Sequence, residues 1–245
     1  MTFLTKKFVV KLGDSSAVTV YRIFQDQFTE EDFPGIDLYS YRKKLREFLE
    51  KEIRSLSFLS KTLTSRELLS SRRIRYRGVS YKLSLPARIF DDISVCKLRG
   101  KFSVERYKFE KDMRLEYERK NEFSFGETEA LEVFLYAGEW VRIAGVPDAI
   151  FENLAVEYTI TRGDINHLLG RCVIYSYMCM KLFTVCSTLI IPTTPGEEIG
   201  FMVIPNSNAL EYYSDLLEEI ITKDVEGKKN KFCNACLYKR ICPSW

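Results

Sequence analysis

Three cysteines lie close together near the end of the chain, where residues 232–242 read FCNACLYKRIC. Cys233, Cys236 and Cys242 have the spacing C-x2-C-x5-C, and thiolates at such short intervals are typical metal ligands. Zinc sites commonly combine two C-x2-C units, and the sequence has no second one. A single distant cysteine would therefore complete the site, an arrangement that iron–sulfur clusters accept. Cys96 is the best candidate, because it lies outside the apolar helix and within the segment DDISVCKLRGKF.

Two carboxylates indicate a second site. Asp148 lies at the end of one predicted strand and Glu157 in the middle of the next, so a short hairpin would bring both to one edge of a sheet. Converging carboxylates suit Mg²⁺ or Mn²⁺, which take oxygen ligands. Such an ion can activate a water molecule for attack on a phosphodiester. The alternative is that the two acids are merely solvated, as most acidic pairs near a turn are.

The helix predicted after Glu157 carries Arg171 and Tyr175 one turn apart, so the two side chains share a face. They could clamp a phosphate or cover the core with their stems. The only histidine, His167, is predicted to have a capping or core role. The remaining cysteines are predicted to be small core residues: Cys172, Cys179 and Cys186.

The stretch RRIRYRGVSYK contains five basic residues and no acid: Arg72, Arg73, Arg75, Arg77 and Lys82. Interleaved with two tyrosines, these side chains could bind a phosphate backbone and stack nucleobases. The alternative is a solvated strand or loop.

Composition limits the class of protein. The chain has 245 residues, 46% hydrophobic and 29% charged, which is ordinary for a globular protein with one large or two small domains. The apolar stretch 172–191 is broken by Lys181, so a buried helix and strand are expected rather than a membrane span. MTFLTKKFVVKLGD is too charged for a signal peptide. We therefore expect a cytoplasmic protein with reduced thiols. The net charge of +3 means that a nucleic-acid partner must be argued from local patches.

Hydrophobic periodicity predicts the elements that would position these residues. Two strands are expected in residues 6–24, a helix from Leu38, and a short helix opened by a capping box at residues 64–67. Asp91 or Asp92 is expected to cap a helix carrying Cys96, and a charged helix is expected over residues 103–120.

The second half is expected to begin with an amphipathic helix, GETEALEVFLYAGEW, that turns four side chains inward: Ala130, Val133, Phe134 and Ala137. The segments WVRIAGVPDAIF and AVEYTITR are expected to form the strands that carry the two acids. A helix over residues 167–180, the strands STLIIP and GFMVIP, and a helix over residues 209–222 should follow.

Taken in order, these features resemble a known family. They are DDISVC, the predicted GETEALE helix, GVPDAI with Asp148, VEYT with Glu157, RCVIY, and the final cysteine unit with Tyr238. The sequence resembles the CRISPR-associated Cas-four exonucleases, relatives of the RecB nuclease domain in the PD-(D/E)XK superfamily. The similarity covers about residues 86–245, and its most specific part is the cysteine triplet together with GVPDAI.

The resemblance implies an α/β fold in which a PD-(D/E)XK nuclease core, a mixed central sheet flanked by helices, occupies residues 86–245. An iron–sulfur segment closes this RecB-like domain, and residues 1–85 form an N-terminal extension. Members bind a 4Fe–4S cluster through one early and three late cysteines, here Cys96, Cys233, Cys236 and Cys242. They are Mg²⁺- or Mn²⁺-dependent nucleases that act on single-stranded DNA ends, together with CRISPR integrase proteins, in spacer acquisition.

Site residues can be carried over where the motifs match. Asp148 and Glu157 match the metal ligands, and Arg171 and Tyr175 would contact the scissile strand. The third ligand would come from the GETEALE helix, where the family's position falls near Glu129 or Ala130 and where Glu127 is another possibility.

Two departures from the family pattern bear on catalysis. Thr159 stands where the motif has a lysine, and Arg171 stands where it has a glutamine. Losing one such electrostatic contact typically costs about a hundredfold or more in rate. The leading hypothesis is an active nuclease, and its rival is a DNA-binding subunit of an adaptation complex with weakened or lost catalysis. A zinc-stabilised interaction module without a DNA role is the third alternative.

Overall fold

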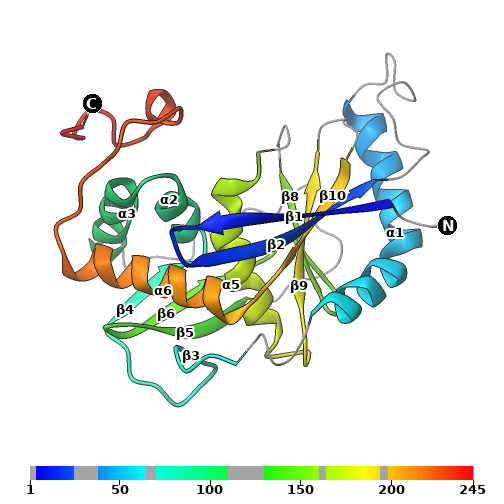
Figure 1. The fold of residues 1–245 in the computed structure, drawn as a ribbon, viewed down its shortest axis with the longest axis horizontal. Helices are drawn as coiled ribbons and strands as arrows, with labels where there is room; N and C mark the ends of the chain where they lie inside the picture. The colour runs from blue at the N-terminus through cyan, green and yellow to red at the C-terminus, as the bar shows by residue number, and fades with distance from the viewer. Residues whose placement is uncertain are drawn as a thin grey trace.

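The computed structural model describes residues 4–24, 38–64, 70–109, 130–159, 164–193 and 198–244. It is an α/β structure with a six-stranded and a four-stranded sheet, both mixed, and with helices packed against them (Figure 1). This arrangement confirms the expected class of mixed sheets flanked by helices. In the described residues, no helix combines the length and apolar character needed to cross a membrane.

The six-stranded sheet has the order β1-β2-β10-β9-β8-β7. Its strands are β1 (Leu4–Leu12), β2 (Ser16–Phe24), β7 (Ala149–Phe151), β8 (Leu154–Thr159), β9 (Ser187–Pro192) and β10 (Glu198–Ile204). Only β8 and β9 run parallel, with Glu157 opposite Ile190. The N-terminal hairpin is an integral part of this sheet, because β2 pairs with β10 along its length.

The four-stranded sheet has the order β3-β5-β6-β4. Its strands are β3 (Ile74–Arg75), β4 (Leu83–Pro86), β5 (Leu131–Ala137) and β6 (Glu139–Gly145). The chain passes directly from β6 in this sheet to β7 in the other, so residues 146–148 join the two sheets. Asp148 therefore lies at the junction of the sheets.

Five α-helices and two 3₁₀ turns complete the described residues. They are α1 (Leu38–Leu63), α2 (Ile89–Val95), α3 (Lys97–Phe109), η3 (Asn166–Leu168), α5 (Leu169–Cys179), α6 (Ser207–Thr222) and η4 (Cys233–Ala235). Helix α1 packs its apolar stripe on one face of the six-stranded sheet. Helix α5 covers the other face and also contacts β5. Because both faces of β9 are covered, all six of its residues are buried.

Helix α5 is the central element of the core. Every residue of it except Arg171 is buried, including Cys172 and Cys179, and Cys186 just after it is buried as well. A helix that is apolar on all sides belongs inside a protein. The prediction that these three cysteines are core residues is confirmed, and Arg171 is the one charge that the helix brings to the centre.

The predicted helix from Gly126 is wrong over its described part. Residues 131–137 form β5, in which Val133, Leu135 and Ala137 are fully buried and Tyr136 is exposed. The apolar residues of EALEVFLYA fit a helical period and an alternating one, and pairing with β3 and β6 selects the strand. Residues 126–129, with the possible ligands Glu127 and Glu129, lie outside the described residues.

Asp91 and Asp92 do not cap the helix that precedes Cys96. They lie in the first turn of α2, which begins at Ile89 because Ile89 and Phe90 are buried in the core. The helix ends at Val95, and Cys96 stands between α2 and α3. The capping box at 64–67 and the charged stretch beyond Phe109 fall largely outside the described residues. The segment WVRIAGVPDAIF, expected as one strand, forms two, β6 and β7, which belong to different sheets. The other elements expected from periodicity are confirmed where the structure describes them.

Helix α5 approaches α2 at Gly170, where close packing leaves no room for a side chain. A Cβ there would meet Tyr213 Cε1 at 2.8 Å and Phe90 Cβ at 2.9 Å. Alanine is the better helix former by about 1 kcal/mol, but overpacking a core costs about 1–3 kcal/mol. We expect Gly170→Ala to lower the free energy of unfolding, measured by urea denaturation. The exposed Ser55→Ala in α1 should leave it unchanged or slightly higher; a stabilised Gly170→Ala protein would contradict the packing.

Candidate functional site

The β7–β8 hairpin brings Asp148 and Glu157 together, as the sequence predicts. Asp148 precedes β7, and its Oδ2 accepts a hydrogen bond from the backbone N–H of Tyr158 at 2.8 Å. The backbone N–H of Asp148 in turn donates to Glu157. These reciprocal bonds fix the two carboxylates relative to the sheet rather than leaving them in solvent.

Arg171 joins this pair to a third acid. Its Nη1 lies 3.4 Å from Glu157 Oε2, and its Nε lies 3.3 Å from Asp91 Oδ2. Asp91 comes from α2, so the site combines α2, β8 and α5. From the sequence, Asp91 is expected only as a helix cap; its place in DDISVC, just before a candidate ligand, is the available signal for its role in the site. We call Asp91, Asp148, Glu157 and Arg171 the carboxylate site.

Tyr175 lies one turn along α5 from Arg171 and is buried. Its hydroxyl donates to the backbone oxygen of Val146 at 3.2 Å, in the segment that leads to Asp148. Gly145 makes this contact possible, since a Cβ there would meet Tyr175 Cε1 at 2.7 Å. Tyr175 therefore supports the loop that carries Asp148.

Burial dominates the electrostatics of the carboxylate site. The side chain of Glu157 is 6% exposed and that of Asp91 is 21% exposed, so the site reaches solvent on the Asp91 side. Burial raises the pKa of Glu157 to about 8 and that of Asp91 to about 7, although Arg171 opposes both shifts. The two carboxylates raise the pKa of Arg171, which stays cationic.

Arg171 pairs with both Asp91 and Glu157, and Asp148 lies beside Glu157, so full ionisation would leave an excess of negative charge. Such an excess is costly unless a proton or a cation balances it. The buried Oδ1 of Asp91 has no hydrogen-bond partner among the described residues. Among all the residues that the structure describes, no three His, Cys, Asp or Glu side chains form a group that could hold one metal ion.

Thr159 ends β8, and its backbone oxygen accepts from the N–H of Thr193 at 2.8 Å. Alternation along the strand places it on the same side as Glu157. The cation that ion-pairs with Glu157 is Arg171, which comes from α5 and not from the strand.

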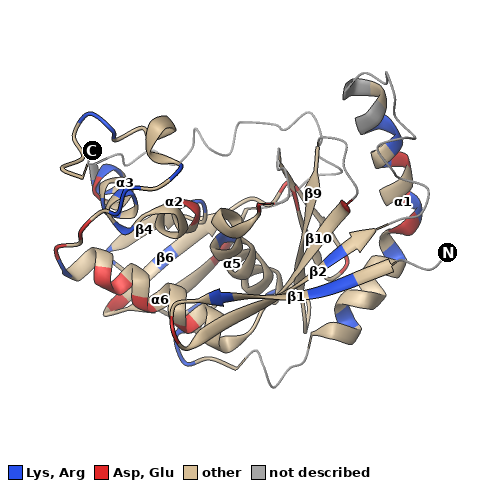
Figure 2. Ribbon diagram, turned by 45° about the horizontal axis from the view of Figure 1, so that its top comes forward, with Lys and Arg blue, Asp and Glu red and all other residues tan. Residues whose placement is uncertain are grey.

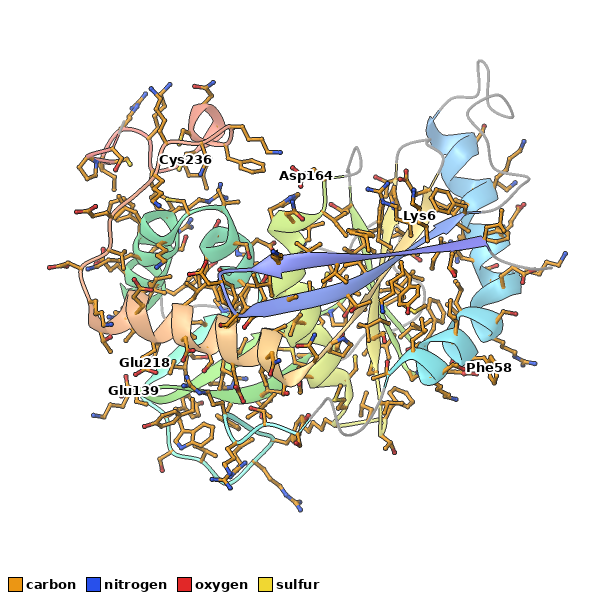
Figure 3. The ribbon with its side chains drawn as sticks, viewed as in Figure 1. Lys6, Phe58, Glu139, Asp164, Glu218 and Cys236 are labelled. Atoms are coloured by element: carbon orange, nitrogen blue, oxygen red, sulfur yellow. The ribbon has the colours of Figure 1, made fainter. Side chains whose placement is uncertain are left out.

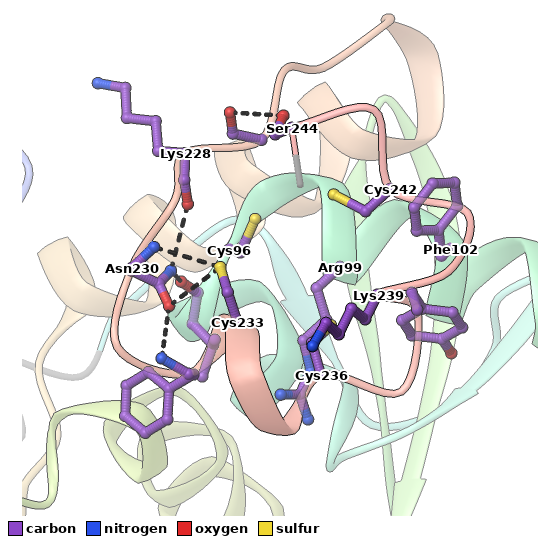
Figure 4. Close-up of a pocket in the computed structure, with 14 residues that line it drawn as sticks. Cys96, Arg99, Phe102, Lys228, Asn230, Cys233, Cys236, Lys239, Cys242 and Ser244 are labelled. Carbon is purple, nitrogen blue, oxygen red and sulfur yellow. Dashed lines mark hydrogen bonds between the residues drawn. The ribbon is translucent and has the colours of Figure 1, made fainter.

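The four predicted cluster ligands surround a single pocket. Cys96, Cys233, Cys236 and Cys242 all line it, and all four are free thiols (Figure 4). Arg99, Lys228 and Lys239 line the same pocket. This donor set suits a group held by thiolates, and the tertiary structure thus brings the distant Cys96 to the terminal triplet.

Helix α2 connects the cysteine pocket with the carboxylate site. Asp91 faces Arg171, whereas the adjacent Asp92 accepts hydrogen bonds from Arg99 Nε and from Ser103, each at 2.6 Å. The Ser103 hydroxyl is also hydrogen-bonded to that of Tyr238 at 3.0 Å. Neighbouring residues of one short helix therefore contact both sites.

A second connection runs through η3, at the start of α5. Lys231 is ion-paired with Asp164, and the ring of Phe232 lies 5.7 Å from that of His167. Figure 3 shows Asp164 near the upper end of α5 and Cys236 in the C-terminal segment above α2 and α3. His167 is half-buried and lies inside η3, whose N-cap is Ile165.

One arginine of the arginine-rich stretch, Arg73, is ion-paired within the protein, and the others are exposed. Arg73 pairs with Asp215 at 2.6 Å and with Glu218 at 3.6 Å, both on the acidic α6 (Figure 2). The guanidinium of Arg75 lies 5.8 Å from the Trp140 ring centre. Arg72 and Arg77 are exposed. Nucleic-acid binding by this stretch stays a prediction.

Comparisons with known proteins give few matches. No protein-family model matches the chain, and no curated protein matches it. Among solved structures, the chain is similar to the crystal structure of SSO0001, with 15% sequence identity and a TM-score of 0.45. That match covers 86% of this chain and 98% of the other.

The raised carboxyl pKa values predict a specific pH dependence of stability. An acid whose pKa is higher in the folded protein binds its proton more tightly there, so folding is favoured below the unfolded pKa. This contribution is lost as pH rises through about 7 for Asp91 and about 8 for Glu157. In protein treated with a metal chelator, we expect the free energy of unfolding to fall as the pH rises from about 5 to about 8.5. Glu157→Gln should flatten this slope in urea titrations; an unchanged slope would contradict the assignment.

Proposed function

We propose that this protein is a metal-dependent nuclease that acts on single-stranded DNA ends. The observation that carries the proposal is that Arg171 pairs with both Asp91 and Glu157, while Asp148 is held beside Glu157 at the junction of the two sheets. A buried excess of carboxylates is a binding site for a hard cation. The proposal assigns the fold to a PD-(D/E)XK core and, from the resemblance to the Cas-four exonucleases, the biological role to spacer acquisition with integrase proteins.

The residues of the site would have distinct roles. Asp148 and Glu157, held by reciprocal backbone bonds, would bind Mg²⁺ or Mn²⁺ together with Asp91, whose Oδ1 is unpartnered among the described residues. When bound, the ion supplies an activated water and neutralises phosphodiester charge. Arg171 would contribute positive charge toward the phosphate, and Tyr175 would keep the Asp148 loop in place through Val146. Glu129 remains the additional ligand expected from the sequence.

The cysteine pocket would hold a 4Fe–4S cluster. In a cluster each thiolate binds a different iron, so the ligands surround a volume rather than a point. Four free cysteines around one pocket, with cations beside them, are compatible with such a group. The cluster would fasten the C-terminal segment to α2 and α3. A zinc ion is the alternative occupant, and iron and sulfide analysis distinguishes the two.

A non-catalytic DNA-binding subunit is the second candidate function, and one observation favours it. Arg171 already neutralises part of the charge on Asp91 and Glu157 without any metal. With Thr159 in place of the motif lysine, the site would retain a stable ion-pair network and lose its chemistry. This protein would bind DNA ends in the cytoplasm without cleaving them.

Cleavage of labelled single-stranded DNA with Mn²⁺ tests the proposed reaction. We expect Asp148→Asn and Glu157→Gln to lose at least about a hundredfold in cleavage rate, because each removes charge that stabilises the transition state. Asp215→Asn, the same type of change at an exposed acid on α6, should cleave like the wild type. Equal activity in all four proteins would indicate a contaminant and reject the proposal. Binding of the same DNA without any cleavage would select the second candidate.

Replacing Thr159 with lysine tests whether the site lacks only one charge. Because Thr159 follows Glu157 on the same side of β8, Thr159→Lys should raise the Mn²⁺-dependent cleavage rate, by up to about a hundredfold. The neutral Thr159→Gln is the matched control for side-chain length and should give no gain. If both variants leave the rate unchanged, the charge deficit is not what limits cleavage.

A further inference from the structure

Asn230 joins the C-terminal segment to the end of α2. Its Nδ2 donates to the backbone oxygen of Val95 at 2.9 Å, and Val95 directly precedes Cys96. Its backbone N–H donates to Cys233 Sγ at 3.2 Å, and the N–H of Cys233 donates to the Asn230 carbonyl oxygen at 3.1 Å. One residue thus contacts both the approach to Cys96 and Cys233 itself, on the wall of the cysteine pocket (Figure 4).

The side chain of Asn230 uses both halves of its amide. While Nδ2 donates to Val95, Oδ1 accepts from the backbone N–H of Phe232 at 2.9 Å. The second bond alone would be an ordinary Asx turn, which aspartate forms equally well. Only an amide supplies a donor and an acceptor at once. The contact with Val95 therefore distinguishes asparagine from aspartate at this position.

These bonds matter because Cys96 and Cys233 are far apart in the sequence. Thiolates that must bind one group have to be brought together and oriented, and hydrogen bonds from neighbouring residues do this in metal sites. An N–H that donates to sulfur also stabilises the thiolate and tunes the reduction potential of a bound cluster. We propose that Asn230 is a positioning residue that holds Cys96 and Cys233 in the arrangement required to load an iron–sulfur cluster. This inference rests on the proposed cluster and is independent of nuclease activity.

Reconstitution with ferrous iron and sulfide under anaerobic conditions tests the role of Asn230. The variants are Asn230→Ala, which removes all the side-chain bonds, and Asn230→Asp, which keeps the acceptor and removes the donor. Asn234→Asp is the matched control, since it makes the same charge change at an exposed position of the same segment. Iron and sulfide per chain, visible absorption and its rate of loss in chelator are measured for each protein.

We expect both Asn230 variants to lose the cluster about 10- to 100-fold faster than the wild type, the range typical of residues that orient metal ligands. The cluster that they retain should have a more negative reduction potential, because a disturbed N–H···S bond stabilises the sulfur charge less. A general loss of stability would not shift this potential. Asn234→Asp should match the wild type in both measurements.

The possible results separate the two proposals. A wild-type protein that takes up no iron and sulfide overturns the cluster and the role of Asn230 together. A loaded wild type with equal retention and potential in both Asn230 variants overturns the role of Asn230 alone. Faster loss in Asn230→Asp but not in Asn230→Ala would be a charge effect and would also overturn it. If Asn230→Asp fails to fold, the uncharged Asn230→Ala gives the answer.

Discussion

The cation of Arg171 is the constraint on which the rest of the structure depends. It is the one charged residue of an otherwise buried helix, and it ion-pairs with Asp91 on α2 and with Glu157 on β8. Removing one partner of a buried ion pair leaves an uncompensated charge, which typically costs about 3–5 kcal/mol. The positions of α2, α5 and the β7–β8 hairpin are therefore coupled, and any function of the carboxylates must accommodate this cation.

Helix α2 extends that coupling to the C-terminal segment. Asp91 belongs to the carboxylate site, while Asp92 takes part in the hydrogen bonds of Arg99, Ser103 and Tyr238 beside the cysteine pocket. Lys231 and Phe232 contact Asp164 and His167, which lie at the segment that leads into α5 and Arg171. A group bound by the four cysteines would thus stabilise both elements that carry Asp91 and Arg171. A cofactor in the cysteine pocket would in this way affect the positions of the carboxylates.

Sequence patterns predicted most of the secondary structure that positions the candidate site. The continuous apolar runs of β9, β10 and α5 predicted buried elements, because elements covered on all sides have few polar residues. Residues 131–137 were ambiguous, since their apolar positions satisfy two periods and only pairing with β6 selected the strand. The helix before Cys96 started earlier than expected because the core requires Ile89 and Phe90.

The sequence by itself determined the groups available for chemistry: the cysteine triplet, the acids of the hairpin, and the arginine and tyrosine of the helix that follows. Spacing carries this information because these residues lie at short intervals along the chain. Only the tertiary structure decided that Asp91 joins the carboxylates and that Arg73 pairs with acids of α6. Both depend on how elements distant in sequence pack, and the charge and burial that set their pKa values and partners exist only after packing.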